Sequence, residues 1–327
     1  MNTTKESVID ILIDNSQKYV SGEYISEQLG LSRASIWKHI NSLRKEGFLI
    51  DSKNGLGYKL VGKSEDSPTQ YEIKYKLDTS YIGQSVHYFK SIDSTNIYAN
   101  KIAEKSNEGT VVISDEQKNG KGRSGKKWDS SQEEGIYFSL ILKPNIPIYK
   151  ASFLTQVAGA AMILSLEKFR IEPQIKWPND IVLNNKKICG ILTEMSAEIE
   201  NISHIIVGIG INISNKTFPS DLINKATSIL AEGYKIDKIE LLRTFFVEFE
   251  KLYDKFKKDD NLETLSILKN KSAVIGRDIF VITRDSKKKV YAKDIDNTGN
   301  LVIVNEDGSE ETIFSGEISI RGLDSYI

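Results

Sequence analysis

"KWPNDIVLNNKKICGIL", residues 176–192, constrains its surroundings more than any other run in the chain. The proline sets a turn that carries Asn179 and Asp180, and Lys176 and Lys187 flank that turn. Mg²⁺ prefers carboxylates together with phosphates, so Asp180 beside two lysines is a candidate metal ligand at a phosphate site. An ordinary turn would use the same residues.

Two further runs carry polar or glycine residues where a core segment would not need them. "VGIGIN" (207–212) places glycines at 208 and 210 inside an apolar strand, and "SIDSTN" (91–96) is short and polar. Glycine within a strand often marks the close approach of a ligand, although a bulge gives the same pattern.

The run "GKGRSGKKW" (120–128) combines three glycines, four cations and a tryptophan. Because glycine is costly in helices and strands, the run is predicted to be a loop. No acid is interleaved with the cations, so the loop would repel itself unless water or an anion held it. It is either a solvated basic surface loop or an anion-binding loop.

From about residue 71 the pattern alternates strands with helices, which predicts an α/β or α+β domain of roughly 200 residues. The strands are predicted over 86–89, 110–114, 136–142, 181–183, 188–194 and 204–213, and a long helix over 151–169. Neither common nucleotide-binding fingerprint is present, and neither is a nucleophile elbow. The single cysteine, Cys189, lies in an apolar run and is predicted to be a buried side chain.

The N-terminal residues have the pattern of a helix-turn-helix. Helices are predicted over 4–15 and 22–29, and a third runs from an N-cap at Ser32 to Gly47, with an apolar stripe at every third or fourth position. "FLIDSKNGLGYKL" (48–60) then reads as a hairpin wing with Asn54-Gly55 as its turn. The residues predicted to contact DNA are Ser32, Arg33, Ser35, Trp37, Lys38 and Asn54.

Charge supports DNA as the partner of this module. Residues 1–32 hold two Lys/Arg against five Asp/Glu, whereas residues 33–59 hold six against two. The basic part is the predicted recognition helix plus the wing. A helix-turn-helix that binds another protein is the alternative.

The C-terminal residues form a third pattern. Residues 240–258 are an amphipathic helix, and from about 272 short strands alternate with turns at 297–300 and 306–309, which predicts a small antiparallel barrel. Seven basic against ten acidic residues over 272–327 argue against DNA contact there.

The whole chain of 327 residues has a net charge of −1 and is long enough for two or three domains. No apolar run is long enough to span a membrane, so a cytoplasmic protein without a membrane partner is expected. The polar run at 62–70 is predicted to be a linker. The predicted domains are 1–63, 70–270 and 271–327.

Taken in order, these runs resemble the bifunctional biotin–protein ligase and biotin-operon repressor family over the whole chain. The resemblance implies an α+β multidomain fold: a winged helix-turn-helix, a central α/β ligase core with a mixed sheet like that of class II synthetases, and a small SH3-like β-barrel. It implies ATP, Mg²⁺ and biotin as ligands, and a biotin carboxyl carrier protein as acceptor. It further implies operator DNA, a ligand-promoted homodimer, and biotinyl-5′-AMP as corepressor. Lys121 departs from the arginine usual at its position and keeps the charge without the planar fork.

The resemblance also implies roles for individual residues. Lys187, Arg123 and Lys176 are expected to surround the reacting carboxylate and phosphates. The biotin contacts are expected at Ser94, Thr95, Asn96, Gln117, Lys121, Lys187, Gly190, Gly208 and Gly210. The nucleotide contacts are expected at Gly120, Gly122, Arg123, Trp128, Lys176, Asn179, Asp180 and Asn212, with Asp180 as the metal ligand. Two alternatives remain open: a lipoate-type ligase on the same fold, and a ligand-sensing repressor with an inactive core.

Overall fold

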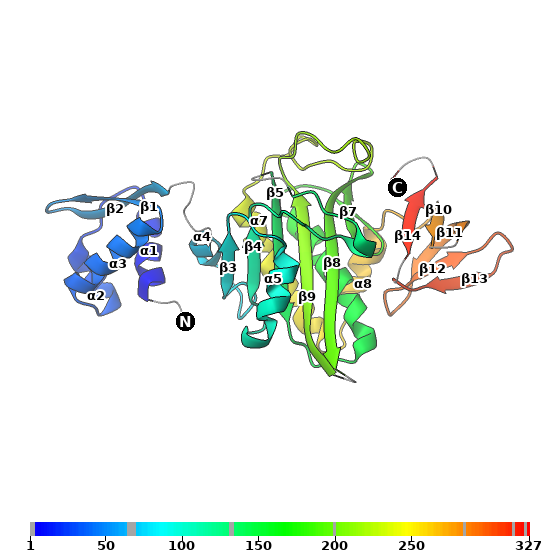
Figure 1. Ribbon diagram of the computed structural model, residues 1–327, viewed down its shortest axis with the longest axis horizontal. Coiled ribbons are helices and arrows are strands. Elements are labelled where there is room, and N and C mark those ends of the chain that lie inside the picture. The colour runs from blue at the N-terminus through cyan, green and yellow to red at the C-terminus, as the bar shows by residue number, and fades with distance from the viewer. Residues whose placement is uncertain are drawn as a thin grey trace. The chain divides into compact units, whose positions relative to one another are not determined.

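The computed structural model describes residues 4–63, 70–130, 134–198, 201–283, 286–315, 318–323 and 326–327. The chain divides into two compact units, residues 1–76 and 77–327, and most of their helices and strands are labelled in Figure 1. Most of the predicted linker, residues 64–69, lies outside the described residues. Among the described helices, none combines the length and the apolar character that a membrane span requires.

The first unit is a winged helix-turn-helix. Its elements are α1 (Thr4–Asp14), α2 (Gly22–Leu29), α3 (Arg33–Lys45), β1 (Phe48–Lys53), β2 (Gly57–Lys63) and α4 (Gln70–Lys74). The hydroxyl of Ser32 accepts a hydrogen bond from the Ser35 amide at 3.2 Å, which begins α3 as the sequence predicts. Gly55, at φ 78°, lies in the turn between the paired strands β1 and β2. The predicted helices and the wing are therefore confirmed.

The core of this unit comes from the apolar stripes of its helices. Ile36, Ile40 and Leu43 of α3 are fully buried in a cluster with side chains of α1, α2 and the wing. Tyr71 of α4 closes this cluster, since its ring packs edge-on against Phe48 with 5.5 Å between centroids.

The second unit is built on a seven-stranded mixed sheet of order β3-β4-β5-β9-β8-β7-β6. Only β3 and β4 pair in parallel. The strands are β3 (Val86–Phe89), β4 (Val111–Ser114), β5 (Gly135–Leu142), β6 (Gln174–Lys176), β7 (Asp180–Leu183), β8 (Lys186–Glu198) and β9 (Asn201–Asn212). The mixed sheet predicted for the core is confirmed.

Helices cover both faces of this sheet. They are α5 (Thr95–Ile102), α6 (Leu154–Glu167), α7 (Lys238–Phe256) and α8 (Leu262–Asn270), with short 3-10 turns at Ala103–Lys105, Arg123–Gly125 and Ile148–Phe153. Phe138 of β5 packs against Phe245 and Phe246 of α7, whereas the next residue, Ser139, meets Asn96 of α5. Successive strand residues point to opposite faces, so α5 and α7 lie on opposite sides of the sheet, as Figure 1 shows.

A second sheet follows in the same unit. It consists of β10 (Asp278–Ile282), β11 (Lys287–Ile295), β12 (Leu301–Val304), β13 (Glu310–Ile313) and β14 (Ser319–Gly322), in the order β13-β12-β11-β10-β14 and antiparallel throughout. The antiparallel strands are as predicted, while closure into an SH3-like barrel stays a prediction. The indole of Trp177 donates to the Gly299 carbonyl at 2.9 Å, which ties this sheet to the turn of the "KWPND" run.

Candidate active site

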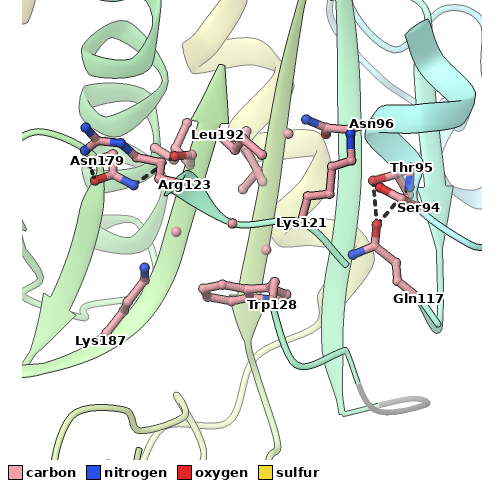
Figure 2. A pocket seen from close by; sticks show the side chains of 16 residues that line it. Ser94, Thr95, Asn96, Gln117, Lys121, Arg123, Trp128, Asn179, Lys187 and Leu192 are labelled. Carbon is pink, nitrogen blue, oxygen red and sulfur yellow. Dashed lines mark hydrogen bonds between the residues drawn. The ribbon is translucent and has the colours of Figure 1, made fainter. Parts of the chain in front are cut away.

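Three glycines of β8 and β9 lie on one face of the sheet. Gly190 is the direct partner of Gly210, and Gly208 lies two residues away opposite Leu192. Because side chains alternate along a strand, all three bare positions open toward the same side. They line a cavity together with the first turn of α5 and the glycine-rich loop, drawn in Figure 2, which is called here the first cavity.

The start of α5 brings polar side chains to this cavity. The side-chain oxygen of Gln117 accepts from the Thr95 amide at 2.8 Å and from the Thr95 hydroxyl at 3.0 Å, as Figure 2 shows. Ser94 is the N-cap of α5 but makes no capping bond, and its hydroxyl is buried with no partner among the described residues. A buried hydroxyl is normally paired, so Ser94 offers a free hydrogen-bonding group to a ligand.

Asn96 is held in place from three sides. Its oxygen lies 2.6 Å from the Ser139 hydroxyl, and its amide donates to Glu194 at 2.7 Å. A methyl group at Gly208 would lie 1.9 Å from that same oxygen. Gly208 therefore makes room for the side chain of Asn96. The sequence pattern did not indicate this reason for a glycine at position 208. The ammonium of Lys121 lies 3.5 Å from Glu194 on the outer side.

The glycine-rich loop folds back on itself as a small hairpin. The Gly122 amide donates to Lys126 at 2.7 Å, and the Trp128 amide donates to Gly120 at 2.9 Å. This hairpin brings the indole of Trp128 over the two paired glycines, where a methyl group at Gly210 would meet it at 2.4 Å. The first cavity consequently has a volume of only about 50 Å³. The prediction that Gly190 and Gly210 leave room for biotin remains, with Trp128 as the side chain that now lies above them.

The hairpin of β6 and β7 gathers charge. Lys176 and Asp180 are cross-strand partners, and the Lys187 ammonium forms an ion pair with Asp180. Burial lowers the pKa of Lys176 to about 6 against the opposing effect of Asp180. Burial by itself would raise the pKa of Asp180, but the charges of Lys187 and Lys176 hold it below its ordinary value. Asp180 is therefore a carboxylate, and the cluster carries the charge pattern of a phosphate site.

Arg123 connects the loop to two other segments. One guanidinium nitrogen donates to Asn179 at 2.9 Å, and the other donates to the carbonyl of Ser315 at 3.1 Å. Asn179 in turn donates to the Ile191 carbonyl at 3.0 Å. Burial lowers the pKa of Arg123, while Asp180 opposes the shift. The loop is thus joined to the core sheet and to the second sheet through one side chain.

A second cavity, with a volume of about 550 Å³, adjoins the first. It is lined by Lys176, Asp180 and Asn212, and also by Arg321 and Tyr326 from beyond the core sheet. Asn212 is 5% exposed and donates to the Thr227 carbonyl at 3.0 Å. The sequence analysis missed Arg321 and Tyr326, because no local pattern distinguishes them from other residues of a small β domain.

The predicted ligand residues of the core thus gather around two adjoining cavities. Those lining the first are Ser94, Thr95, Asn96, Gln117, Lys121, Gly122, Arg123, Trp128, Asn179, Lys187, Gly190, Gly208 and Gly210, and those lining the second are Gly122, Arg123, Trp128, Lys176, Asn179, Asp180, Lys187 and Asn212. Gly120 lines neither, and its carbonyl closes the loop hairpin instead. The described residues contain no group of three or more His, Cys, Asp or Glu that could hold a metal ion.

The residues predicted to contact DNA lie at α3 and the wing tip. Trp37 is 57% exposed, and Lys38 and Asn54 are exposed as well. Arg33 forms an ion pair with Glu23 at 2.6 Å, with both side chains largely in solvent. The hydroxyl of Ser32 is engaged in capping α3.

Comparison with known proteins matches all three patterns. A model of the Biotin/lipoate A/B protein ligase family matches residues 88–212, an HTH domain model matches 4–59, and a biotin protein ligase C terminal domain model matches 274–321. The bifunctional ligase/repressor BirA of Bacillus spizizenii is 35% identical over 98% of this chain and 99% of its own length. The chain belongs to the BirA family of biotin protein ligases.

Other members of the BirA family agree. BirA of Escherichia coli is 29% identical over 99% of both chains. Among solved structures, the biotin protein ligase from Aquifex aeolicus in complex with biotin and ATP has a TM-score of 0.64 at 30% identity, and covers 73% of this chain and 99% of its own.

For this member of the BirA family, Gly208→Ala is expected to raise the KM for biotin by about tenfold, because the new methyl group displaces Asn96 at a cost of about 1–3 kcal/mol. Initial rates of adenylate formation against biotin concentration measure the effect. Gly62→Ala is the matched control, since a methyl group there meets only Leu49 at 3.7 Å. An unchanged KM for biotin in Gly208→Ala would contradict the placement of Asn96.

Proposed function

We propose that the protein joins biotin to ATP and then transfers biotin from biotinyl-5′-AMP to a lysine of a biotin carboxyl carrier protein. The observation that supports this most strongly is the boundary between the two cavities. Arg123, Trp128, Asn179 and Lys187 line both cavities, so a carboxylate in the first and a phosphate in the second would meet between the same cations. Two anions repel each other as they approach to bonding distance, and cations shared by both binding sites offset that repulsion.

In the first step a carboxylate oxygen of biotin attacks the α-phosphorus of ATP, and the bond to the β-phosphate oxygen breaks to release pyrophosphate. Lys187 would contact both reactants: it lines both cavities, its ammonium lies 5.0 Å from the ring centre of Trp128, and it pairs with Asp180. Arg123 adds a second cation, held by Asn179. These charges offset the repulsion that otherwise raises the barrier.

In the second step the amine of the carrier lysine attacks the acyl carbon, AMP leaves with the bonding electrons, and the amine loses a proton. No enzyme nucleophile takes part. The buried Cys189 agrees with this, since burial raises the pKa of its thiol well above the ordinary value. Closure of the glycine-rich loop would keep water from the acyl-adenylate between the steps.

Mg²⁺ would enter with the nucleotide. Mg²⁺ is commonly bound by one or two carboxylates together with substrate phosphates, and Asp180 in the second cavity supplies one ionised carboxylate. The ion would neutralise phosphate charge. Asp180 also pairs with Lys187, so the lysine and the ion would share this carboxylate.

The assignment is tested by incubating the protein with ATP, biotin and a purified carrier domain, and by measuring the mass of the carrier. A mass increase equal to one biotin minus one water supports the ligase. An unmodified carrier together with tight biotin and DNA binding would support the repressor with an inactive core.

The first unit is proposed to bind operator DNA as part of a cytoplasmic repressor. Arg33→Ala is expected to weaken operator binding by about 1–3 kcal/mol if Arg33 contacts a base, and to lower the salt slope by about 0.9 if it contacts a phosphate. Binding to a duplex selected from a random library, measured at several salt concentrations, distinguishes these outcomes. Lys18→Ala, an exposed lysine of the same unit outside α3 and the wing, is the control. Equal binding by both variants would remove Arg33 from the interface.

Biotinyl-5′-AMP is proposed to be the corepressor, acting through a homodimer that reads two half-sites. If closing the loop over the adenylate completes a dimer surface, the ligand lowers the entropy that dimerisation must overcome. Operator affinity and the mass in solution are expected to rise with biotin plus ATP, and much less with biotin alone. Equal affinity and equal mass in the two conditions would contradict this coupling and leave the ligase assignment intact.

A further inference from the structure

Tyr326 lies directly on the charged cluster of the second cavity. Its carbonyl accepts a hydrogen bond from the Lys176 ammonium at 2.9 Å, and its ring centre lies 3.3 Å from the same nitrogen. Its hydroxyl donates to Asp180. One residue therefore contacts the amine of Lys176 through its carbonyl and ring, and the carboxylate of Asp180 through its phenol.

This arrangement covers the groups that the reaction needs. Lys176 is 2% exposed and Tyr326 is 8% exposed. One carboxylate oxygen of Asp180 is taken by the Tyr326 hydroxyl, and the other pairs with Lys187. The carbonyl oxygen of Tyr326 already accepts a hydrogen bond from Lys176, in the place where a phosphate oxygen would accept one.

Arg321 also contacts the ring of Tyr326. Its guanidinium lies 4.8 Å from the ring centre of Tyr326, and it lines the second cavity. The ring thus contacts both Lys176 and Arg321, whose like charges repel each other when Lys176 is protonated. A polyphosphate would screen this repulsion more strongly than an aromatic ring does, because it carries full negative charges.

We infer that Tyr326 occupies the position of the nucleotide phosphates, and that ATP must displace it from Lys176 and Asp180 before it can bind productively. This inference rests on the proposed function. The contacts of Tyr326 stabilise the cluster when no nucleotide is bound, and the same contacts compete with the phosphates of ATP and with pyrophosphate. Tyr326 sets the nucleotide affinity and leaves the biotin contacts in the first cavity untouched.

The kinetic test is Tyr326→Ala in the full chain, with Tyr291→Ala as matched control. Tyr291 is a 44% exposed tyrosine of β11 that lines neither cavity. If Tyr326 blocks the phosphate position, only the fraction of molecules in which it has moved away can bind ATP, and the apparent affinity for ATP falls by that fraction. Removing the Tyr326 side chain is therefore expected to lower the KM for ATP by about fivefold or more. The inhibition constant for pyrophosphate should fall in parallel, while the KM for biotin stays within about twofold. Tyr326→Phe, which loses only the hydroxyl, should lie between wild type and Tyr326→Ala, which loses the ring as well; both variants keep the main-chain carbonyl.

A merely structural role for Tyr326 gives different results. If Tyr326 only supports the site, Tyr326→Ala would raise the KM for ATP or leave it unchanged, and either result overturns the inference. Hydrogen exchange of residues 318–323 and 326–327 provides a second readout: a non-hydrolysable ATP analogue is expected to speed exchange by displacing Tyr326, and slower exchange would overturn the inference. Wild-type protein that forms no biotinyl-adenylate would instead refute the proposed function, so the two failures are distinguishable.

Discussion

Lipoate offered in place of biotin is expected to be adenylated with a kcat/KM lower by about 10⁴-fold or more, because a site built to hydrogen-bond a ureido ring leaves its own polar groups unpaired with the wrong substrate. The hydroxyl of Ser94, which has no partner among the described residues, and the Thr95–Gln117 pair line the first cavity, where the apolar dithiolane ring of lipoate offers no ureido group. Each buried group left without a partner costs about 1–3 kcal/mol. Pyrophosphate release under each substrate measures the ratio.

The source of this discrimination can be checked with two variants. Ser94→Ala and Gln117→Ala should both lower the rate with biotin while changing the rate with lipoate little, so that the ratio falls through the rate with biotin. Ser106→Ala is a suitable control, because Ser106 bonds the Ile102 carbonyl at the end of α5, away from both cavities. Comparable rates with biotin and lipoate in the wild type would move the assignment to a lipoate-type ligase.

Lys187→Ala is expected to slow adenylate formation by several hundred-fold, which corresponds to about 3–4 kcal/mol of lost transition-state stabilisation. The lysine lines both cavities and pairs with Asp180, whose side chain is 13% exposed, so its removal takes away a cation that both proposed reactants would meet. The neighbouring Lys186→Ala is the control, since Lys186 lines neither cavity.

A loss of folding must be separated from a loss of chemistry in this experiment. Without Lys187 the carboxylate of Asp180 loses its ion-pair partner and keeps the hydrogen bond from Tyr326 and the charges of Lys176 and Arg123, so some stability is expected to be lost. Thermal unfolding of the variant measures that loss directly. A folded Lys187→Ala enzyme with near-normal turnover would remove Lys187 from the proposed role.

Local signals accounted for the first unit almost completely. The apolar stripe of α3, the cap at Ser32 and the turn at Asn54-Gly55 each depend on residues a few positions apart, and all three appear as predicted. The helix α5 escaped prediction because "STN" reads as a polar loop, and its asparagines are weak helix formers. The long helix predicted over 151–169 is α6, preceded by the 3-10 turn Ile148–Phe153.

Most of the predicted ligand residues line the two cavities, but their arrangement there could not be predicted from the sequence. Spacing placed the lysines and Asp180 beside one turn, but Tyr326 meets Lys176 across 150 positions of sequence, and no periodicity reports such a contact. The glycines of β8 and β9 suggested open space, whereas strand register and loop closure bring Trp128 and Asn96 over them. Those contacts depend on tertiary packing alone.

The closed core of the first unit has a consequence for how genes of this kind can be assembled. The described cluster around Ile36 and Ile40 draws its side chains from residues 8–71 alone, and Tyr71 is its last member. Recombination at about Lys76 would therefore separate a regulator from an enzyme with both interiors intact. A junction at residue 63 would carry Tyr71 away with the wrong partner. Proteins in which the regulator is fused or lost at about residue 76 should fold, whereas those joined at residue 63 should be destabilised.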